Sequence, residues 1–252
     1  MIGIFDSGIG GLTVVKNIVE KCPLQDIVYF GDTARCPYGE KDRDTIISFS
    51  LNNARFLNQW PLDALIVACG TASACAIDAL QQEMTIPVIG VIDTAVQAAV
   101  NATKNGRVAI LATTTTIASR AYQEKLQSTS SLIQTVPLPC PQFVPLLEKR
   151  CVDSKQVRAI VKETLQPIVN SEIDTAILGC THYPLLADII QEELGPAVTL
   201  IDTSKVSANS VIDFCKEGSG LRHYYVSDNP EKFQELSFHF FNEPISASCG
   251  QR

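Results

Sequence analysis

The sequence predicts an α/β fold with mainly parallel sheets flanked by helices. Short apolar runs alternate with longer amphipathic runs along the 252 residues. Most of the short runs are continuously apolar, which is typical of strands that are covered on both faces. Strands that alternate with helical patterns favour parallel α/β layers.

Eight short apolar runs predict buried strands. These runs are residues 2–5, 27–30, 64–68, 88–91, 108–111, 176–178, 198–201 and 224–226. The amphipathic runs between them predict helices, for example over residues 12–21, 43–60, 72–84 and 156–170. The tail after residue 244 is expected to be loose.

The composition limits the possible classes of function. Apolar residues make up 46% and charged residues 19%, which is typical of a globular chain with a sizeable core. A net charge of −7 argues against non-specific nucleic-acid binding and against an anionic membrane surface. No run reaches the roughly 18 apolar residues of a membrane span. The opening MIGIFDSG lacks the features of a secretory leader, so a cytoplasmic protein is expected.

The nine cysteines are scattered and form no CxxC pair. An odd number of cysteines without a leader predicts reduced thiols rather than a disulfide framework. Only three histidines accompany them, so no metal site is expected.

Two cysteines occupy matching positions. Cys69 and Cys180 each follow an apolar strand and precede a helix start that carries Thr71 or Thr181. Ligands of open α/β sheets bind outside the carboxyl ends of strands, and a helix N-terminus lowers the pKa of a thiol. A single such cysteine is more simply explained as a small buried side chain. Two in matching positions favour a site in which His182 is a proton partner.

A weak internal echo surrounds these cysteines. Residues 64–72 resemble residues 175–183, and residues 3–8 loosely resemble residues 109–114. Two similar α/β units explain the echo, and so does the monotony of α/β sequence. The sequence alone leaves both explanations open.

Two loops are expected at the same rim of the sheet. Residues 6–11 are glycine-rich and open a helix, a combination that lets an anionic ligand approach the backbone. Their spacing does not match a dinucleotide fingerprint, and Asp6 would lie beside a phosphate, so a plain turn is the alternative. Residues 31–39 form either a long turn or a binding loop with Tyr38 over the pocket.

Six motifs occur in one order and together resemble those of the glutamate racemases. They lie at residues 5–12, 31–39, 68–72, 90–92, 140–146 and 178–186. FDSGIGGL and LGCTHYPLL are the most specific of them, and the resemblance covers nearly the whole chain. It implies cofactor-independent interconversion of L- and D-glutamate, which supplies D-glutamate for peptidoglycan, by a cytoplasmic enzyme of a commonly homodimeric family.

The resemblance also implies two pseudo-symmetric α/β domains with the active site in the cleft between them. Residues 1–93 plus 203–252 are expected to form the first domain, which contains both termini. Residues 94–202 are expected to form the second. The internal echo fits this arrangement.

Roles for individual residues follow from the same resemblance. It implies that Cys69 is the base for the D-enantiomer and Cys180 the base for the L-enantiomer. Asp6 is expected to assist Cys69, His182 to assist Cys180, and Glu148 to act near the second thiol; without the resemblance, Glu148 is an ordinary solvated helix residue. Substrate contacts are implied for Asp6, Ser7, Tyr38, Gly39, Gly70, Thr71, Thr181 and His182.

Two positions depart from the family pattern. Gly70 stands where the family usually has an asparagine whose side chain hydrogen-bonds the substrate. Losing one such bond costs on the order of 1–3 kcal/mol, although the backbone N–H of Gly70 offers a substitute. Thr94 stands where the family often has a proline.

These departures leave alternatives open. The first is a racemase for another amino acid, such as aspartate. The second is a Cys–His hydrolase, which needs only one of the two cysteines as nucleophile. The third is a catalytically weakened homologue that binds a ligand or a partner.

Overall fold

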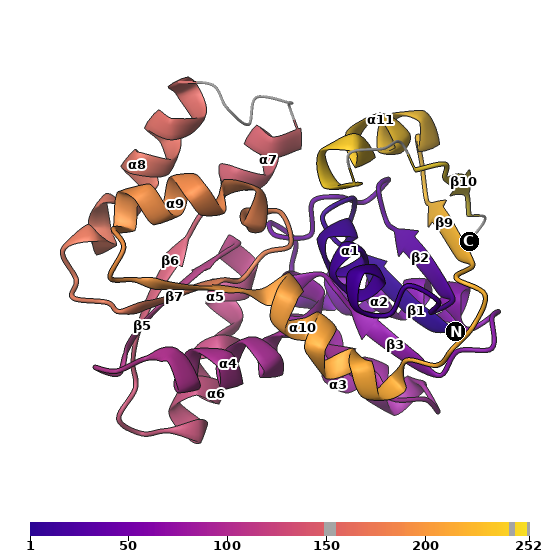
Figure 1. Ribbon diagram of the computed structural model, residues 1–252, viewed down its shortest axis with the longest axis horizontal. Helices are drawn as coiled ribbons and strands as arrows, with labels where there is room; N and C mark the ends of the chain where they lie inside the picture. The colour runs from indigo at the N-terminus through magenta and orange to yellow at the C-terminus, as the bar shows by residue number, and fades with distance from the viewer. Residues whose placement is uncertain (149–154, 242–244, 251–252) are drawn as a thin grey trace.

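The computed structural model describes residues 1–148, 155–241 and 245–250 (Figure 1). Within them the strands form a six-stranded and a four-stranded sheet, and every strand pair is parallel. Helices cover both faces of each sheet, so the predicted α/β fold class is confirmed. No helix in the described part of the chain is both long and apolar enough to span a bilayer.

The first sheet has the strand order β10-β9-β2-β1-β3-β4. Its strands are β1 (Ile2–Asp6), β2 (Ile27–Gly31), β3 (Ala64–Val67), β4 (Val88–Gly90), β9 (Arg222–Val226) and β10 (Ser248–Cys249). Every residue of β1, β2 and β3 is buried, which explains their continuous hydrophobicity. One face packs on α1 (Leu12–Lys21) and α11 (Pro230–Phe241), and the other packs on α2 (Arg43–Leu57) and α3 (Gly70–Glu83).

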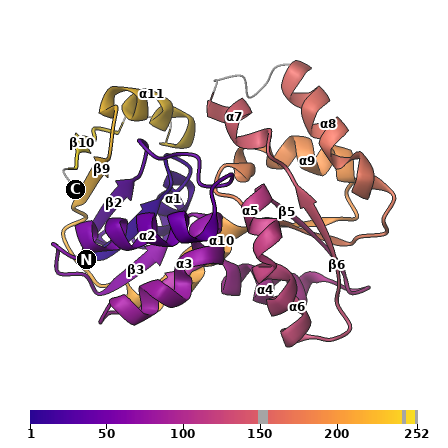
Figure 2. The same cartoon turned by 180° about the vertical axis from the view of Figure 1, so that it is seen from behind.

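The second sheet has the strand order β6-β5-β7-β8. Its strands are β5 (Arg107–Ala112), β6 (Gln134–Pro139), β7 (Thr175–Leu178) and β8 (Thr199–Asp202). On one face lie α7 (Phe143–Glu148), α8 (Lys155–Val169), η1 (Tyr183–Leu186) and α9 (Ala187–Leu194). On the other lie α4 (Val91–Ala102), α5 (Thr114–Ser119) and α6 (Ala121–Thr129), as Figure 2 shows.

The two sheets share one topology. Strands β2-β1-β3-β4 of the first correspond in order to β6-β5-β7-β8 of the second. Cys69 follows the third strand of one set and Cys180 follows the third strand of the other. The internal echo therefore lies on two similarly wound α/β units.

The chain passes between the sheets twice. After β4 it enters α4, whose buried residues pack on the second sheet, and after β8 it returns through α10 (Thr203–Val211). Helix α10 contacts both α1 and α4 and lies between the two sheets in Figures 1 and 2. We retain residues 1–93 plus 203–252 and residues 94–202 as proposed domains; the first boundary falls inside α4, just after the change of sheet.

Two strands were not expected from the sequence. In strand β6 only Leu138 is buried, and the strand contains Pro137 and Pro139, so it lacks an apolar run and two N–H donors. It lies at the edge of its sheet, where missing donors are tolerated. Strand β10 has only two residues and lies in the tail that was expected to be loose.

Candidate active site

The two matching cysteines lie at the junction between the two sheets, each just after the end of a strand. Cys69 is the N-cap of α3, directly after β3, and Cys180 follows β7; both side chains are buried. A Cβ atom placed on Gly70 would lie 3.9 Å from the Cα of Cys180 and 2.3 Å from the carbonyl oxygen of Gly179. The two strand ends therefore abut, with one thiol on each side of the junction.

Cys69 hydrogen-bonds with neutral groups, and the charge of Asp6 also acts on it. Its thiol donates to the Ser7 hydroxyl at 3.5 Å, and its sulfur accepts from the N–H of Ala72 at 3.5 Å. Burial raises the pKa of Cys69 to about 12, and the charge of Asp6 adds to the rise. The expectation that the helix N-terminus lowers the pKa of this thiol is wrong, because one weak N–H contact does not offset burial.

Asp6 is fully buried between the two halves. Its carboxylate accepts from the N–H of Gly8 at 2.9 Å and from the Thr181 hydroxyl at 3.3 Å. Burial raises the pKa of Asp6, while His182 and these hydrogen bonds oppose the rise. Asp6 is thus the last residue of β1 in the first sheet, yet it receives a hydrogen bond from the second half.

Charged groups surround Cys180. The Nδ1 atom of His182 lies 4.0 Å from the Cys180 sulfur, and Nε2 lies 3.6 Å from Oε1 of Glu148. Burial disfavours the imidazolium, but Cys180 and Glu148 outweigh it and raise the pKa of His182 to about 10. Burial likewise opposes the charge of Glu148, and His182 overcomes it and lowers the pKa of that carboxyl. The result is a row formed by the Cys180 sulfur, the His182 imidazolium and the Glu148 carboxylate.

Three further residues expected at the site lie at this junction. Ser7 contacts Cys69, Thr181 contacts Asp6, and the Thr71 hydroxyl lies 2.9 Å from that of Thr113 in the second half. The chemistry that these groups offer a ligand is hydroxyl hydrogen bonding beside two helix starts.

Tyr38 and Gly39 lie in the loop after β2. The carbonyl of Gly39 accepts from the N–H of Thr115 at 3.1 Å, which ties this loop to the second half. Tyr38 differs from the expected position over the pocket. Its ring is buried in the first half, and its hydroxyl donates to Asp32 and accepts from Asn53. Its role as a substrate contact stays a prediction.

Gly70 has a steric role that the family pattern does not suggest. Any Cβ here would press on the Gly179 carbonyl at 2.3 Å, a distance that real Cβ atoms do not show. A side chain at position 70 therefore requires the two halves to move apart. The glycine permits a close approach, in addition to removing the amide that the family usually carries.

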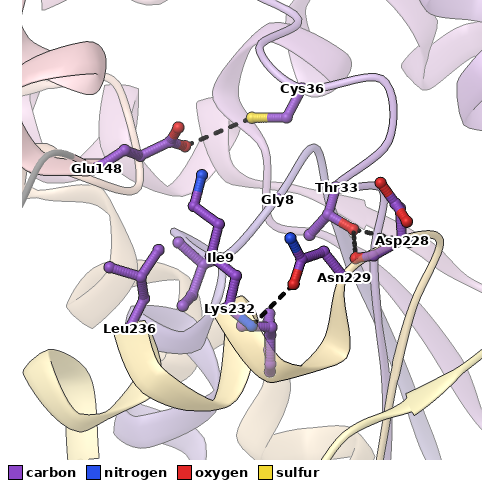
Figure 3. A pocket seen from close by; sticks show the side chains of 10 residues that line it. Gly8, Ile9, Thr33, Cys36, Glu148, Asp228, Asn229, Lys232 and Leu236 are labelled. Carbon is purple, nitrogen blue, oxygen red and sulfur yellow. Dashed lines mark hydrogen bonds between the residues drawn. The ribbon is translucent and has the colours of Figure 1, made fainter.

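A pocket of about 140 Å³ opens beside this junction (Figure 3). Cys36, Gly8 and Glu148 line one side, and Lys232 and Leu236 of α11 line the other. Neither Cys69 nor Cys180 lines it, and both thiols are buried. Figure 3 shows Lys232 extending from α11 toward Glu148 and Cys36.

Sequence reasoning missed Cys36 and Lys232. Cys36 lies in the loop after β2, directly before Pro37, and no local pattern distinguishes its thiol from an ordinary structural cysteine. Lys232 lies in an amphipathic helix far along the chain, and no local pattern connects it with Glu148. Only the tertiary arrangement brings these residues together.

A comparison with known families decides the assignment. The model of the Asp/Glu/Hydantoin racemase family matches residues 2–211. The chain belongs to this family. A glutamate racemase from Persephonella marina is 46% identical over 239 residues, which cover 93% of this chain and 91% of the relative. A glutamate racemase from Geobacter metallireducens is 42% identical over 247 residues, covering 95% and 92%.

Solved structures agree. A glutamate racemase from Bacillus anthracis superposes with a TM-score of 0.96 at 36% identity. The superposition covers 100% of this chain and 97% of the Bacillus anthracis chain. One from Francisella tularensis, in complex with D-glutamate, gives a TM-score of 0.91 at 37% identity, covering 98% and 95%. An aspartate racemase homologue from Pyrococcus horikoshii reaches 0.60 at 18% identity, a likeness of fold alone.

Proposed function

We propose that the protein interconverts L- and D-glutamate without a cofactor and so supplies D-glutamate for peptidoglycan. The observation that carries the proposal is the pair of buried thiols, Cys69 and Cys180, at abutting strand ends. Its full-length similarity to glutamate racemases supports glutamate as the substrate, in preference to aspartate. An isomerase that needs both thiols also fits better than a hydrolase that needs one.

The chemistry requires two acid–base groups on opposite sides of the α-carbon. For L-glutamate, Cys180 takes the α-proton as a thiolate beside the His182 imidazolium. Cys69, held as a thiol by burial, returns its own proton to the opposite face. One proton leaves carbon and one arrives, so the substrate changes configuration while the two sulfurs exchange protonation states. For D-glutamate the roles are reversed, and Asp6 is the group placed to accept a proton on the Cys69 side.

The carbanionic intermediate needs stabilisation from the protein. We propose that backbone N–H groups at the helix starts near Ser7, Thr71 and Thr181, with the neighbouring hydroxyls, hold the substrate carboxylates. Fixed donors in a water-poor site stabilise developing charge more than water does. This arrangement accommodates an anionic substrate on a protein of net charge −7. A crystal structure with glutamate bound away from these helix starts would overturn it.

The decisive experiment is exchange in D₂O without added cofactor. Purified protein receives L-glutamate or D-glutamate; proton NMR follows α-deuterium and chiral chromatography follows configuration. Interconversion with deuterium incorporation from both enantiomers supports the proposal. Exchange of the α-proton of aspartate but not of glutamate would refute glutamate as the substrate. If no amino acid exchanges its α-proton, racemisation is refuted and a binding role is left.

Two further expectations, on oligomeric state and location, accompany this function. The resemblance to glutamate racemases supports a homodimer that works in the cytoplasm. For a chain of 27.4 kDa, light scattering after gel filtration should give twice that mass. A single-chain mass at micromolar concentration would contradict the dimer.

A further inference from the structure

A third thiol, Cys36, lies against the catalytic junction. It belongs to the loop between β2 and α2 in the first half of the molecule. A Cβ atom on Gly8 would lie 3.0 Å from the Cys36 sulfur, so this sulfur packs directly on the loop that carries Asp6. The backbone of that loop therefore limits where the thiol can point.

The thiol of Cys36 donates to Oε1 of Glu148 at 3.5 Å. The same oxygen lies 3.6 Å from Nε2 of His182. One carboxylate oxygen is thus shared between a thiol from the first half and an imidazole from the second. Burial, with the neighbouring carboxylate, raises the pKa of Cys36 above its ordinary range. The side chain therefore stays an S–H donor wherever the protein works.

The side chain of Glu148 has room to move, so its position against His182 needs a restraint. It ends α7, its side chain is 27% exposed, and it faces a pocket into which Lys232 also points. His182 Nε2, by contrast, is buried and makes no hydrogen bond to any described residue. The charge on His182 therefore depends on how closely Glu148 is held, and a carboxylate drawn toward Lys232 would leave it poorly paired.

We propose that Cys36 is a positioning residue for Cys180: its hydrogen bond holds Glu148 against His182, which keeps the imidazolium beside the Cys180 sulfur. The contact spans the two halves, so it forms only when they meet. Its effect on turnover rests on the proposed function, whereas its effect on His182 does not. The other ionisable groups near this row are Asp6 beside His182, and Lys232 and His239 around Glu148.

The direct test is the titration of His182, followed by NMR of nitrogen-labelled histidine. The chain has only three histidines, so single substitutions at His223 and His239 assign the signals. In Cys36→Ala, the titration midpoint of His182 should fall by roughly 0.5–1 pH unit, the size of one lost hydrogen bond to the carboxylate. Cys36→Ser, which keeps a donor, should recover most of the fall.

Cys75→Ala is the matched control, because it removes another buried thiol in the same half. It should leave the His182 midpoint unchanged. Cys36→Val removes the donor and fills the space with an apolar side chain, and it replaces Cys36→Ala if the latter does not fold. An unaltered midpoint in folded Cys36→Ala or Cys36→Val, or an equal fall in Cys75→Ala, would overturn the proposal.

Kinetics give a second readout. The equilibrium constant between enantiomers cannot change, so kcat/KM should fall equally in both directions, by about 3- to 10-fold. The primary isotope effect should rise with α-deuterated L-glutamate, whose deuteron goes to Cys180, and should not rise with the D-enantiomer. An isotope effect that changes equally for both enantiomers would refute a role on the Cys180 side. If the protein racemises no glutamate, the proposed function fails, and the histidine titration still decides the role of Cys36.

Discussion

The Cys69 side and the Cys180 side of the junction have matching backbones and different electrostatics. Each thiol follows the third strand of an equivalent parallel sheet. Around Cys69 lie a hydroxyl and an N–H, and burial keeps it a neutral thiol. Around Cys180 lie an imidazolium and a carboxylate. Topology pairs the two sulfurs, and the side chains beyond them give each sulfur a different electrostatic environment.

The difference has a limited consequence for catalysis. Under the proposed function, Cys180 is the base and Cys69 the acid for L-glutamate. The difference cannot favour one enantiomer at equilibrium, since a catalyst lowers both directions of a barrier equally. What it can set is which of the two proton transfers limits turnover. The predictions below test that difference between the sides.

The largest effect should come from removing either sulfur. Cys69→Ala and Cys180→Ala should each lower racemisation by about 10²- to 10⁴-fold, because each inversion needs both a base and an acid. Chiral chromatography measures the loss, and proton NMR in D₂O shows whether the remaining thiol still exchanges its own enantiomer. Cys75→Ala controls for thiol removal. Near-normal racemisation by either variant would end the two-thiol mechanism.

His182→Asn should act on one side only. It removes the charge beside Cys180 and should lower kcat/KM on the order of 10²-fold. The isotope effect should then rise with α-deuterated L-glutamate and not with the D-enantiomer. His223→Asn, which lies away from this row, serves as the control. If the isotope effect rises equally for both enantiomers, the two sides are not separate.

His182 also predicts a pH dependence of stability. Its pKa rises from 6.5 to about 10 in the folded protein. The stabilisation from the charged ring is therefore fully present below pH 6.5, declines above it, and is lost as the pH rises through about 10. Denaturant unfolding between pH 6 and 10 should show this decline in the wild type and a smaller one in His182→Asn. Parallel curves for the two proteins would contradict a charged His182.

Substitutions at Gly70 test the close approach of the two strand ends, Gly70 on one side and Gly179 on the other. Gly70→Ala adds only a Cβ, and Gly70→Asn adds the amide of the family pattern. The helix gains about 0.5–1 kcal/mol from losing a glycine, but overpacking against the Gly179 carbonyl costs about 1–3 kcal/mol, so both should be destabilised. Activity should fall by about 10-fold in each. A gain of activity in Gly70→Asn would mean that the amide matters more than the approach.

The sequence predicts the backbone of this site better than its charges. Continuous apolar runs mark β1, β3, β5 and β7, and the two cysteines stand where strands of equivalent position end. Periodicity cannot find β6, because an exposed edge strand with two prolines carries no apolar run. The motif resemblance, and not the local pattern, singled out Glu148.

Local sequence patterns do not predict the protonation states of the site. Cys69 carries a helix-start signal that predicts a lowered pKa, yet burial, which is a tertiary property, reverses it. Tyr38 lies in a motif loop, but Asp32 and Asn53 draw its hydroxyl into the first half. Cys36 contacts Glu148 only because the loop after β2 packs against the end of α7, far away in the sequence. Such contacts depend on packing between halves, which a local pattern does not encode.

Lys232→Met should have the smallest effect and should fall on the Cys180 side. The ammonium is exposed, and its charge helps to lower the pKa of Glu148 only after the larger contributions of His182 and Cys36. Exposed charge pairs contribute about 0–1 kcal/mol, so kcat/KM should change by about 2-fold or less. The change should shrink as ionic strength rises, because salt screens exposed charges.

Lys155→Met, an exposed lysine at the start of α8, gives the matched control for loss of one positive charge. A 10-fold loss in Lys232→Met alone would show that this ammonium, and not Cys36, holds Glu148 in place. The Cys180 side would then depend on α11 as well as on the loop after β2. A small, salt-sensitive change instead leaves Glu148 restrained from the first half, by a thiol whose hydrogen bond salt does not screen.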